Sequence, residues 1–84
     1  MIKTWQQYKK ENNIDPLWDI NSFFNMHSIG FEDLNYFDKA LNDGNSMLEV
    51  VQNVVKDQDF VEVIYQTRRL GHRAVGAYIY GRRK

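Results

Sequence analysis

Apolar residues recur at helical spacing over the first two thirds of the chain. Thr4 and Gln7 have the spacing of a capping box, in which the side chain of each residue accepts a hydrogen bond from the backbone N–H of the other. They predict a first short helix with an apolar stripe on Trp5 and Tyr8. We expect this helix to end at Asn12.

A second helix is predicted to start at Asp15 and Pro16. An Asp side chain caps a helix N-terminus well, and a Pro at the first helical position loses no hydrogen bond. Gly30 ends the pattern. The residues that follow Pro16 at helical spacing are Leu17, Ile20, Phe23, Phe24 and His27.

Two more helices are predicted before residue 58. In residues 31–42, Glu32 and Asp33 stand where the first turn of a helix favours anions, and the apolar face comprises Phe31, Leu34, Phe37 and Leu41. Ser46 and Glu49 form a second capping box. The helix of residues 46–56 that follows has its apolar stripe on Met47, Val51, Val54 and Val55.

The last quarter of the chain has a different pattern. Residues 60–65 and 74–80 are rich in β-branched and aromatic side chains, which are typical of strands. With Gly71 between them, they predict an antiparallel hairpin with a basic tip from Arg68 to Arg73. An alternative is a helix that starts near Asp59 and ends near Gly71, which would make the protein all-α. The β-branched content favours the hairpin.

Together these elements predict one small α+β domain over residues 1–84, with three or four short helices followed by a C-terminal antiparallel β-hairpin. The element order is that of a winged helix, with residues 31–42 and 46–56 as the helix-turn-helix and the hairpin as the wing. The outward positions of residues 46–56 include Glu49, Gln52, Asn53 and Lys56, so this helix has little positive charge. We therefore expect contact through the wing, or a protein contact, and not major-groove reading by this helix.

The charged residues are divided between the two ends of the chain, although the net charge is zero. Residues 67–84 contain six cations and no acid. Residues 1–66 contain all 11 acids and five Lys, so their charge is −6 against +6 for the C-terminal part. An asymmetry of this size indicates a binding surface near the C-terminus.

The candidate site follows from the period of the second predicted strand. Alternation directs Val75, Ala77 and Ile79 toward the core, and Tyr78 and Tyr80 to the other face. Exposed rings among cations are typical of nucleic-acid surfaces, because cations neutralise phosphates and rings stack on bases. His72 adds charge only when it is protonated. The candidate binding residues are Arg68, Arg69, His72, Arg73, Tyr78, Tyr80, Arg82 and Arg83.

The sequence offers few groups for catalysis. The chain has no Cys, so disulfides and thiolate sites are excluded, and His27 and His72 are too far apart in the sequence to suggest a metal site. We expect no metal and no cofactor. A metal-independent ribonuclease that uses the Arg, His and Tyr residues of the hairpin is an alternative, but a pI near 6.7 disfavours it.

We therefore expect a small non-enzymatic binding protein whose basic hairpin engages nucleic acid or a nucleoprotein complex. The alternative is a protein–protein inhibitor or adaptor of the phage or mobile-element type, which acts on a host enzyme or defence complex. A homodimer through a strand edge is a further alternative. No apolar run approaches the ~18 residues of a membrane helix and no secretory segment precedes the first helix, so we expect a cytoplasmic protein without a membrane partner.

Overall fold

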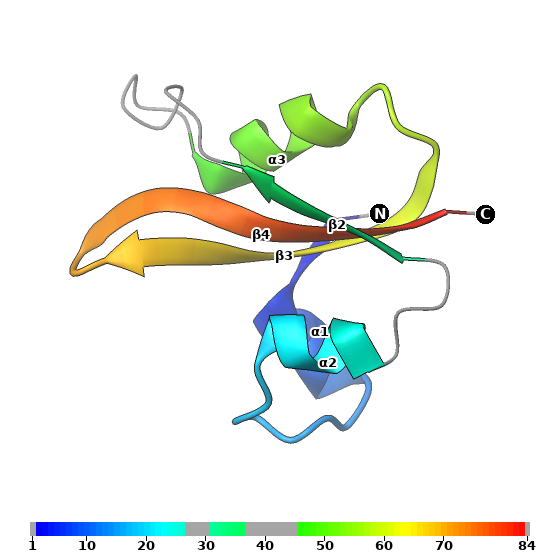
Figure 1. Ribbon diagram of the computed structural model, residues 1–84, viewed down its shortest axis with the longest axis vertical. Coiled ribbons are helices and arrows are strands. Elements are labelled where there is room, and N and C mark those ends of the chain that lie inside the picture. Colours follow the sequence, from blue (N-terminus) through cyan, green and yellow to red (C-terminus); the bar gives the residue numbers. More distant parts are fainter. Residues whose placement is uncertain (1, 27–30, 37–45, 84) are drawn as a thin grey trace.

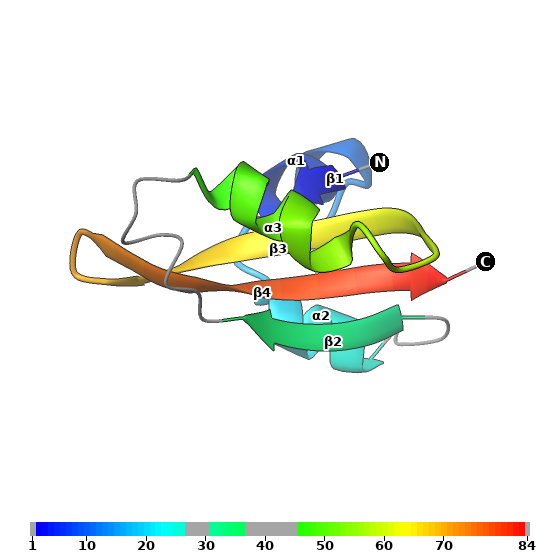
Figure 2. The same cartoon turned by 90° about the horizontal axis from the view of Figure 1, so that it is seen from above.

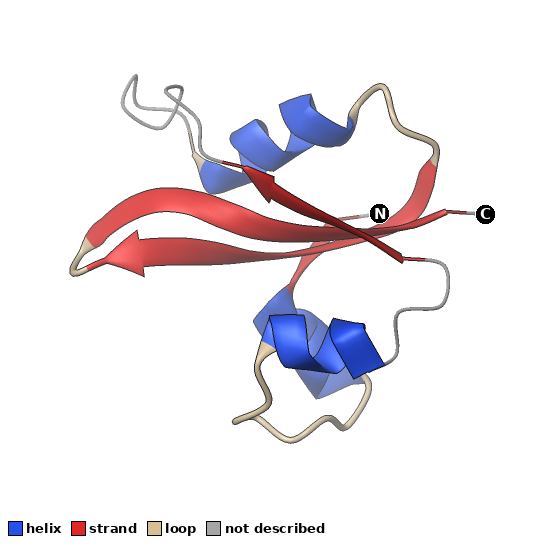
Figure 3. Cartoon of the chain, viewed as in Figure 1, coloured by secondary structure: helices blue, strands red, loops and turns tan. Residues whose placement is uncertain are grey.

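The computed structural model describes residues 2–26, 31–36 and 46–83, the segment 31–36 by its backbone. A mixed four-stranded sheet forms the middle layer, in the order β1-β3-β4-β2, and helices cover both of its faces (Figures 1 and 3). The α+β class is confirmed, and the all-α alternative is wrong. The elements are β1 (Ile2–Thr4), α1 (Trp5–Glu11), α2 (Ile20–Met26), β2 (Phe31–Tyr36), α3 (Met47–Val55), β3 (Phe60–Leu70) and β4 (Arg73–Arg83).

The predicted hairpin is the centre of the sheet. β3 and β4 pair antiparallel from Phe60 opposite Arg83 to Leu70 opposite Arg73, with register shifts between Phe60 and Glu62 and between Arg68 and Arg69. The turn between them has two residues, and Gly71 at its first position has a φ of +64°, a conformation that glycine adopts without steric cost. β1 adds to the outer edge of β3 in parallel, and β2 adds to the outer edge of β4 in antiparallel orientation (Figure 2).

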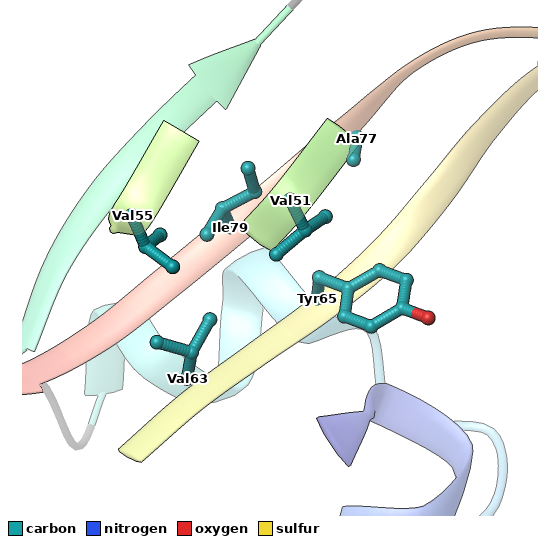
Figure 4. Close-up of a cluster of buried hydrophobic side chains, with 6 residues drawn as sticks. All are labelled: Val51, Val55, Val63, Tyr65, Ala77 and Ile79. Atoms are coloured by element: carbon teal, nitrogen blue, oxygen red, sulfur yellow. The ribbon is translucent and has the colours of Figure 1, made fainter. Parts of the chain in front are cut away.

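One face of the sheet packs against α3. One half of the predicted capping box is confirmed, since the Ser46 hydroxyl accepts a hydrogen bond from the backbone N–H of Glu49 at 3.3 Å. Figure 4 shows the apolar side chains of α3 above those of β3 and β4. This cluster comprises Val51, Val55, Val63, Tyr65, Ala77 and Ile79.

The opposite face of the sheet packs against α1 and α2, and its core is mostly aromatic. Trp5 begins α1 and is 2% exposed, and its indole N–H donates to the carbonyl of Trp18 at 3.1 Å. The predicted capping box of α1 is confirmed, as is its end at Asn12. The buried residues of this cluster are Trp5, Ile20, Phe24, Ile64 and Tyr80.

The predicted start of the second helix is wrong. Asp15 closes a turn instead, because its carboxylate accepts from the backbone N–H of Leu17 at 2.9 Å and its carbonyl accepts from that of Trp18. Leu17 is 93% exposed and is not part of an apolar stripe. The helix begins at Ile20, where Asp19 accepts from two backbone N–H groups of the first turn.

The helix predicted over residues 31–42 is also wrong. Residues 31–36 form β2 and pair with β4 at all six positions, and residues 37–42 lie outside the described part of the chain. The free edge of β4 supplies partners for the N–H and C=O groups of this segment, and this long-range pairing overrides the local helical spacing. Since the first helix of the expected helix-turn-helix is a strand, the winged-helix order is wrong too.

The ring of Phe60 lies on Gly81, across the β3–β4 pair. A Cβ added at Gly81 would lie 2.6 Å from several atoms of that ring, so only glycine fits beneath it without a shift. The guanidinium of Arg83 lies over the same ring at 4.7 Å. Gly81 and Arg83 therefore have a structural role, since both pack against the ring of Phe60.

We expect Gly81→Ala to destabilise the protein by about 1–3 kcal/mol, because the Phe60 ring must move to admit the methyl group. Urea unfolding measures this loss. In the Phe60→Ala background the same substitution is expected to cost less than about 1 kcal/mol, because the obstructing ring is gone. Equal losses in the two backgrounds would contradict this packing account.

Candidate nucleic-acid interface

The structure separates the candidate basic residues into two groups at opposite ends of the hairpin. Arg68, Arg69, His72 and Arg73 lie at the turn, and Arg82 and Arg83 lie at the far end of β4. At roughly 3.3 Å per residue, the two groups are about 30 Å apart. The eight candidate residues therefore do not form one continuous surface.

The turn end of the hairpin extends beyond its neighbouring strands. Within the described residues, the pairing of β1 with β3 ends at Tyr65, and the pairing of β2 with β4 ends at Ala77. We call residues 66–76 the arm. Figure 1 shows the arm projecting past α1, α2 and α3, as the yellow and orange end of the ribbon.

The arm carries cations on both faces. Arg68 follows Ile64 and Gln66 in alternation and lies on the α1–α2 side of the sheet, whereas Arg69 lies on the α3 side. Arg73 is directly opposite Leu70 and so shares the face of Arg68. Residues 67–84 contain no acid, so this stretch of chain has an excess of positive charge.

Most of the arm's side chains are exposed. Arg69, His72 and Arg73 are all in this class, and Leu70 beside them is 76% exposed. Arg69 donates to the carbonyl of His72 at 3.5 Å, which is too long for a strong hydrogen bond. Arg68 is half-buried, because its guanidinium lies 4.8 Å from the centre of the Tyr78 ring.

The expectation that Tyr80 lies on an open face is wrong. Tyr80 is 3% exposed, stacks on Phe24 with ring centres 4.7 Å apart, and donates a hydrogen bond to the side-chain oxygen of Asn21. Tyr78 packs partly against the same cluster. Alternation correctly assigned these rings to the face opposite Ala77 and Ile79, but α1 and α2 cover that face. A base therefore cannot stack on Tyr80 in this fold.

At the far end of β4, the two arginines make contacts within the fold. Arg82 forms an ion pair with Glu62 at 3.6 Å, and Glu62 also lies 3.9 Å from Lys3. Arg83 donates to the side-chain oxygen of Gln58 at 2.8 Å and covers Phe60. Both arginines are exposed, but part of their hydrogen-bonding capacity is used within the domain.

A pocket of about 310 Å³ lies beside the base of the arm, at the point where β1 ends. The cationic residues in its wall are Lys9 and Arg69, and Trp5 and Tyr65 also line it. Lys9 donates to the carbonyl of Pro16 at 2.6 Å and lies 5.4 Å from the Trp5 ring. The sequence contains no signal for this pocket, because it depends on the pairing of the three-residue strand β1 with β3. The polar lining comprises Thr4, Gln6, Gln66 and Thr67.

The described ranges contain no group of three or more His, Cys, Asp or Glu side chains arranged to hold a metal ion. No helix in the same part of the chain has the length and apolarity needed to cross a bilayer. No protein-family model, curated protein or solved structure matches this chain.

Replacing the two tyrosines separately tests their placement. We expect Tyr80→Ala to destabilise the protein by about 3–5 kcal/mol, since it removes a buried ring and leaves a cavity beside Phe24. Tyr78→Ala is expected to cost no more than about 2 kcal/mol, since Tyr78 is only partly buried. Thermal and urea unfolding measure both losses. A smaller loss for Tyr80→Ala than for Tyr78→Ala would contradict the described packing.

The alkaline behaviour of Tyr65 provides a second test. Burial raises the pKa of the Tyr65 hydroxyl above its ordinary value, and burial raises that of Tyr8 as well. The neutral phenol therefore contributes to the free energy of unfolding, and this contribution is complete below about pH 10, near the pKa of the unfolded chain. It is lost as the pH rises through the folded-state pKa. We expect Tyr65→Phe to lose less unfolding free energy than the unaltered protein between about pH 8 and pH 11. Equal losses would show that Tyr65 does not contribute.

Proposed function

We propose that the protein is a non-enzymatic binding module that engages nucleic acid, free or within a nucleoprotein complex, through the arm. The observation that carries this proposal is the arrangement of Arg68, Arg69 and Arg73 around a projecting two-stranded tip. A two-stranded ribbon has dimensions that the major groove of a duplex admits. Cations on both faces of such a ribbon can reach the phosphates on both sides of the groove.

The burial of Tyr80 changes the binding mode that we propose. With that ring inside the fold and Tyr78 beneath Arg68, base stacking is a weak basis for affinity. Phosphate contacts from the arginines are the stronger basis, and they favour a duplex over a splayed single strand. We do not extend the proposal to RNA cleavage, because Tyr80 is buried and Arg82 lies at the other end of the strand.

Fluorescence anisotropy with a labelled 20-base-pair duplex tests the proposal. Three phosphate contacts on a duplex predict a log–log salt slope of about −2.7, so affinity is expected to fall about 40-fold between about 50 and 200 mM salt. The double variant R69E/R73E is expected to bind at least about tenfold more weakly at the lowest salt and to have a shallower slope. Circular dichroism checks that the variant folds.

The matched control is K10E/K56E, which makes the same change in net charge at two exposed positions on α1 and at the end of α3. We expect it to retain most of the affinity and the slope. If the control weakens binding as much as R69E/R73E, the attraction comes from the overall charge and not from the arm. Absence of binding at about 50 mM salt would overturn the proposal.

A further inference from the structure

The outer edge of β3 is paired over only part of its length. β3 has 11 residues, and β1 pairs with three of them, Val63, Ile64 and Tyr65. Among the described residues, no strand lies beside residues 66–70 on that side, and we call this stretch the open edge. In an antiparallel ladder, alternate residues direct their N–H and C=O groups away from the partner strand. The open edge therefore presents backbone donors and acceptors to any extended chain that continues the line of β1.

The sequence ends β1 at a fixed point. Thr4 is both the last residue of β1 and the N-cap of α1, where its hydroxyl accepts from the backbone N–H of Gln7 at 3.1 Å. Trp5 then enters the core and is 2% exposed. Because these contacts turn the chain away from the sheet, β1 cannot extend along the open edge.

The pocket at the end of β1 borders the open edge and defines the chemistry of an occupant. Its walls include Lys9 and Arg69 but no acidic side chain. Tyr65 lines the pocket as well, and its phenol is a hydrogen-bond donor of the kind that a carboxylate accepts from. Gln66 and Thr67 line the same pocket from the open edge itself.

We propose that the open edge binds an extended, acidic segment of a partner protein as an added strand, with one of its carboxylates in the pocket. This goes beyond nucleic-acid binding by the cations of the arm, because it gives one backbone edge of the arm, together with the adjoining pocket, a protein-binding role. A strand satisfies both the N–H and the C=O groups of the edge. A nucleic-acid backbone offers mainly acceptors and would leave the carbonyl groups unpaired.

A second copy of the chain is a poorer occupant than an acidic segment. Pairing of two open edges would place Arg68 and Arg69 of one copy close to those of the other, and like charges on paired strands are unfavourable. Cations on an edge strand also protect against self-association. The charge complementarity of Lys9 and Arg69 thus favours a carboxylate-bearing strand.

The test uses the full chain, isotopically labelled, and NMR titration with a capped hexapeptide of alternating Glu and Val at up to about 1 mM. We expect amide shifts at residues 65–69 and at Lys9. Two further peptides carry N-methyl groups at the odd or at the even positions. One of them is expected to lose binding and the other to keep it, because only alternate N–H groups of an added strand face the edge.

Three results would overturn the proposal. They are an absence of shifts at the highest peptide concentration, equal binding of the two N-methylated peptides, and equal binding of a hexapeptide of alternating Lys and Val. The second result would show that attraction occurs without strand pairing. Shifts that follow the protein concentration and not the peptide concentration would identify the edge as a contact between copies, and they too would overturn the proposal.

Matched variants separate peptide binding at the open edge and pocket from duplex binding by the cations of the arm. Lys9→Met keeps an unbranched side chain of similar length but removes the charge that lies near Trp5, and it is expected to weaken binding of the Glu–Val peptide about two- to fivefold. Lys10→Met, the next residue and outside the pocket, is expected to leave peptide binding unchanged. Lys9 is not part of the arm, so Lys9→Met is expected to leave duplex affinity unchanged. Failure of peptide binding and failure of duplex binding are thus distinguishable.

Discussion

The fold depends on the pairing of β3 with β4, two long strands that are buried on both faces. Ile64 and its cross-strand partner Tyr80 face the aromatic cluster of α1 and α2, while Tyr65 and its partner Ile79 face α3. Burying successive residues on opposite sides requires two helical layers, and the helices among the described residues cover the middle of the hairpin and not its turn end (Figure 1). The exposed arm is what remains beyond the layers.

Local signals in the sequence predicted those parts of the fold whose causes are local. The caps at Thr4 and Ser46 and the β-branched hairpin are short-range features, and the structure confirms them. β2 could not be predicted, because residues 31–36 have helical spacing and become a strand only by pairing with β4, which lies more than 40 residues further along the chain. β1 has three residues, too few for any periodicity to be recognised.

The sequence predicted which residue types make up the candidate site but not how they are arranged in space. The sequence showed that the C-terminal 18 residues lack acids, and the arm contains three of their arginines. It did not show that a strand places Arg73 and Arg82 about 30 Å apart. Nor did it show that Tyr80 is covered. A strand in which apolar and polar residues alternate is normally solvated on one face, whereas the Tyr80 ring here is part of an aromatic core. Within the described residues, β1 and β2 each pair with only part of the hairpin, and both proposed surfaces lie on the part beyond them.

Amide hydrogen exchange measured by NMR tests most directly the claim that the arm projects uncovered from a doubly covered hairpin. The account predicts that the amides of Ile64 and Tyr80 are among the slowest to exchange, because they lie in the paired centre under both helical layers. It predicts rapid exchange for those amides of residues 66–70 that point away from β4. Protection of these outward amides equal to that of Ile64 would mean that the edge is covered in the free protein, and it would contradict the account.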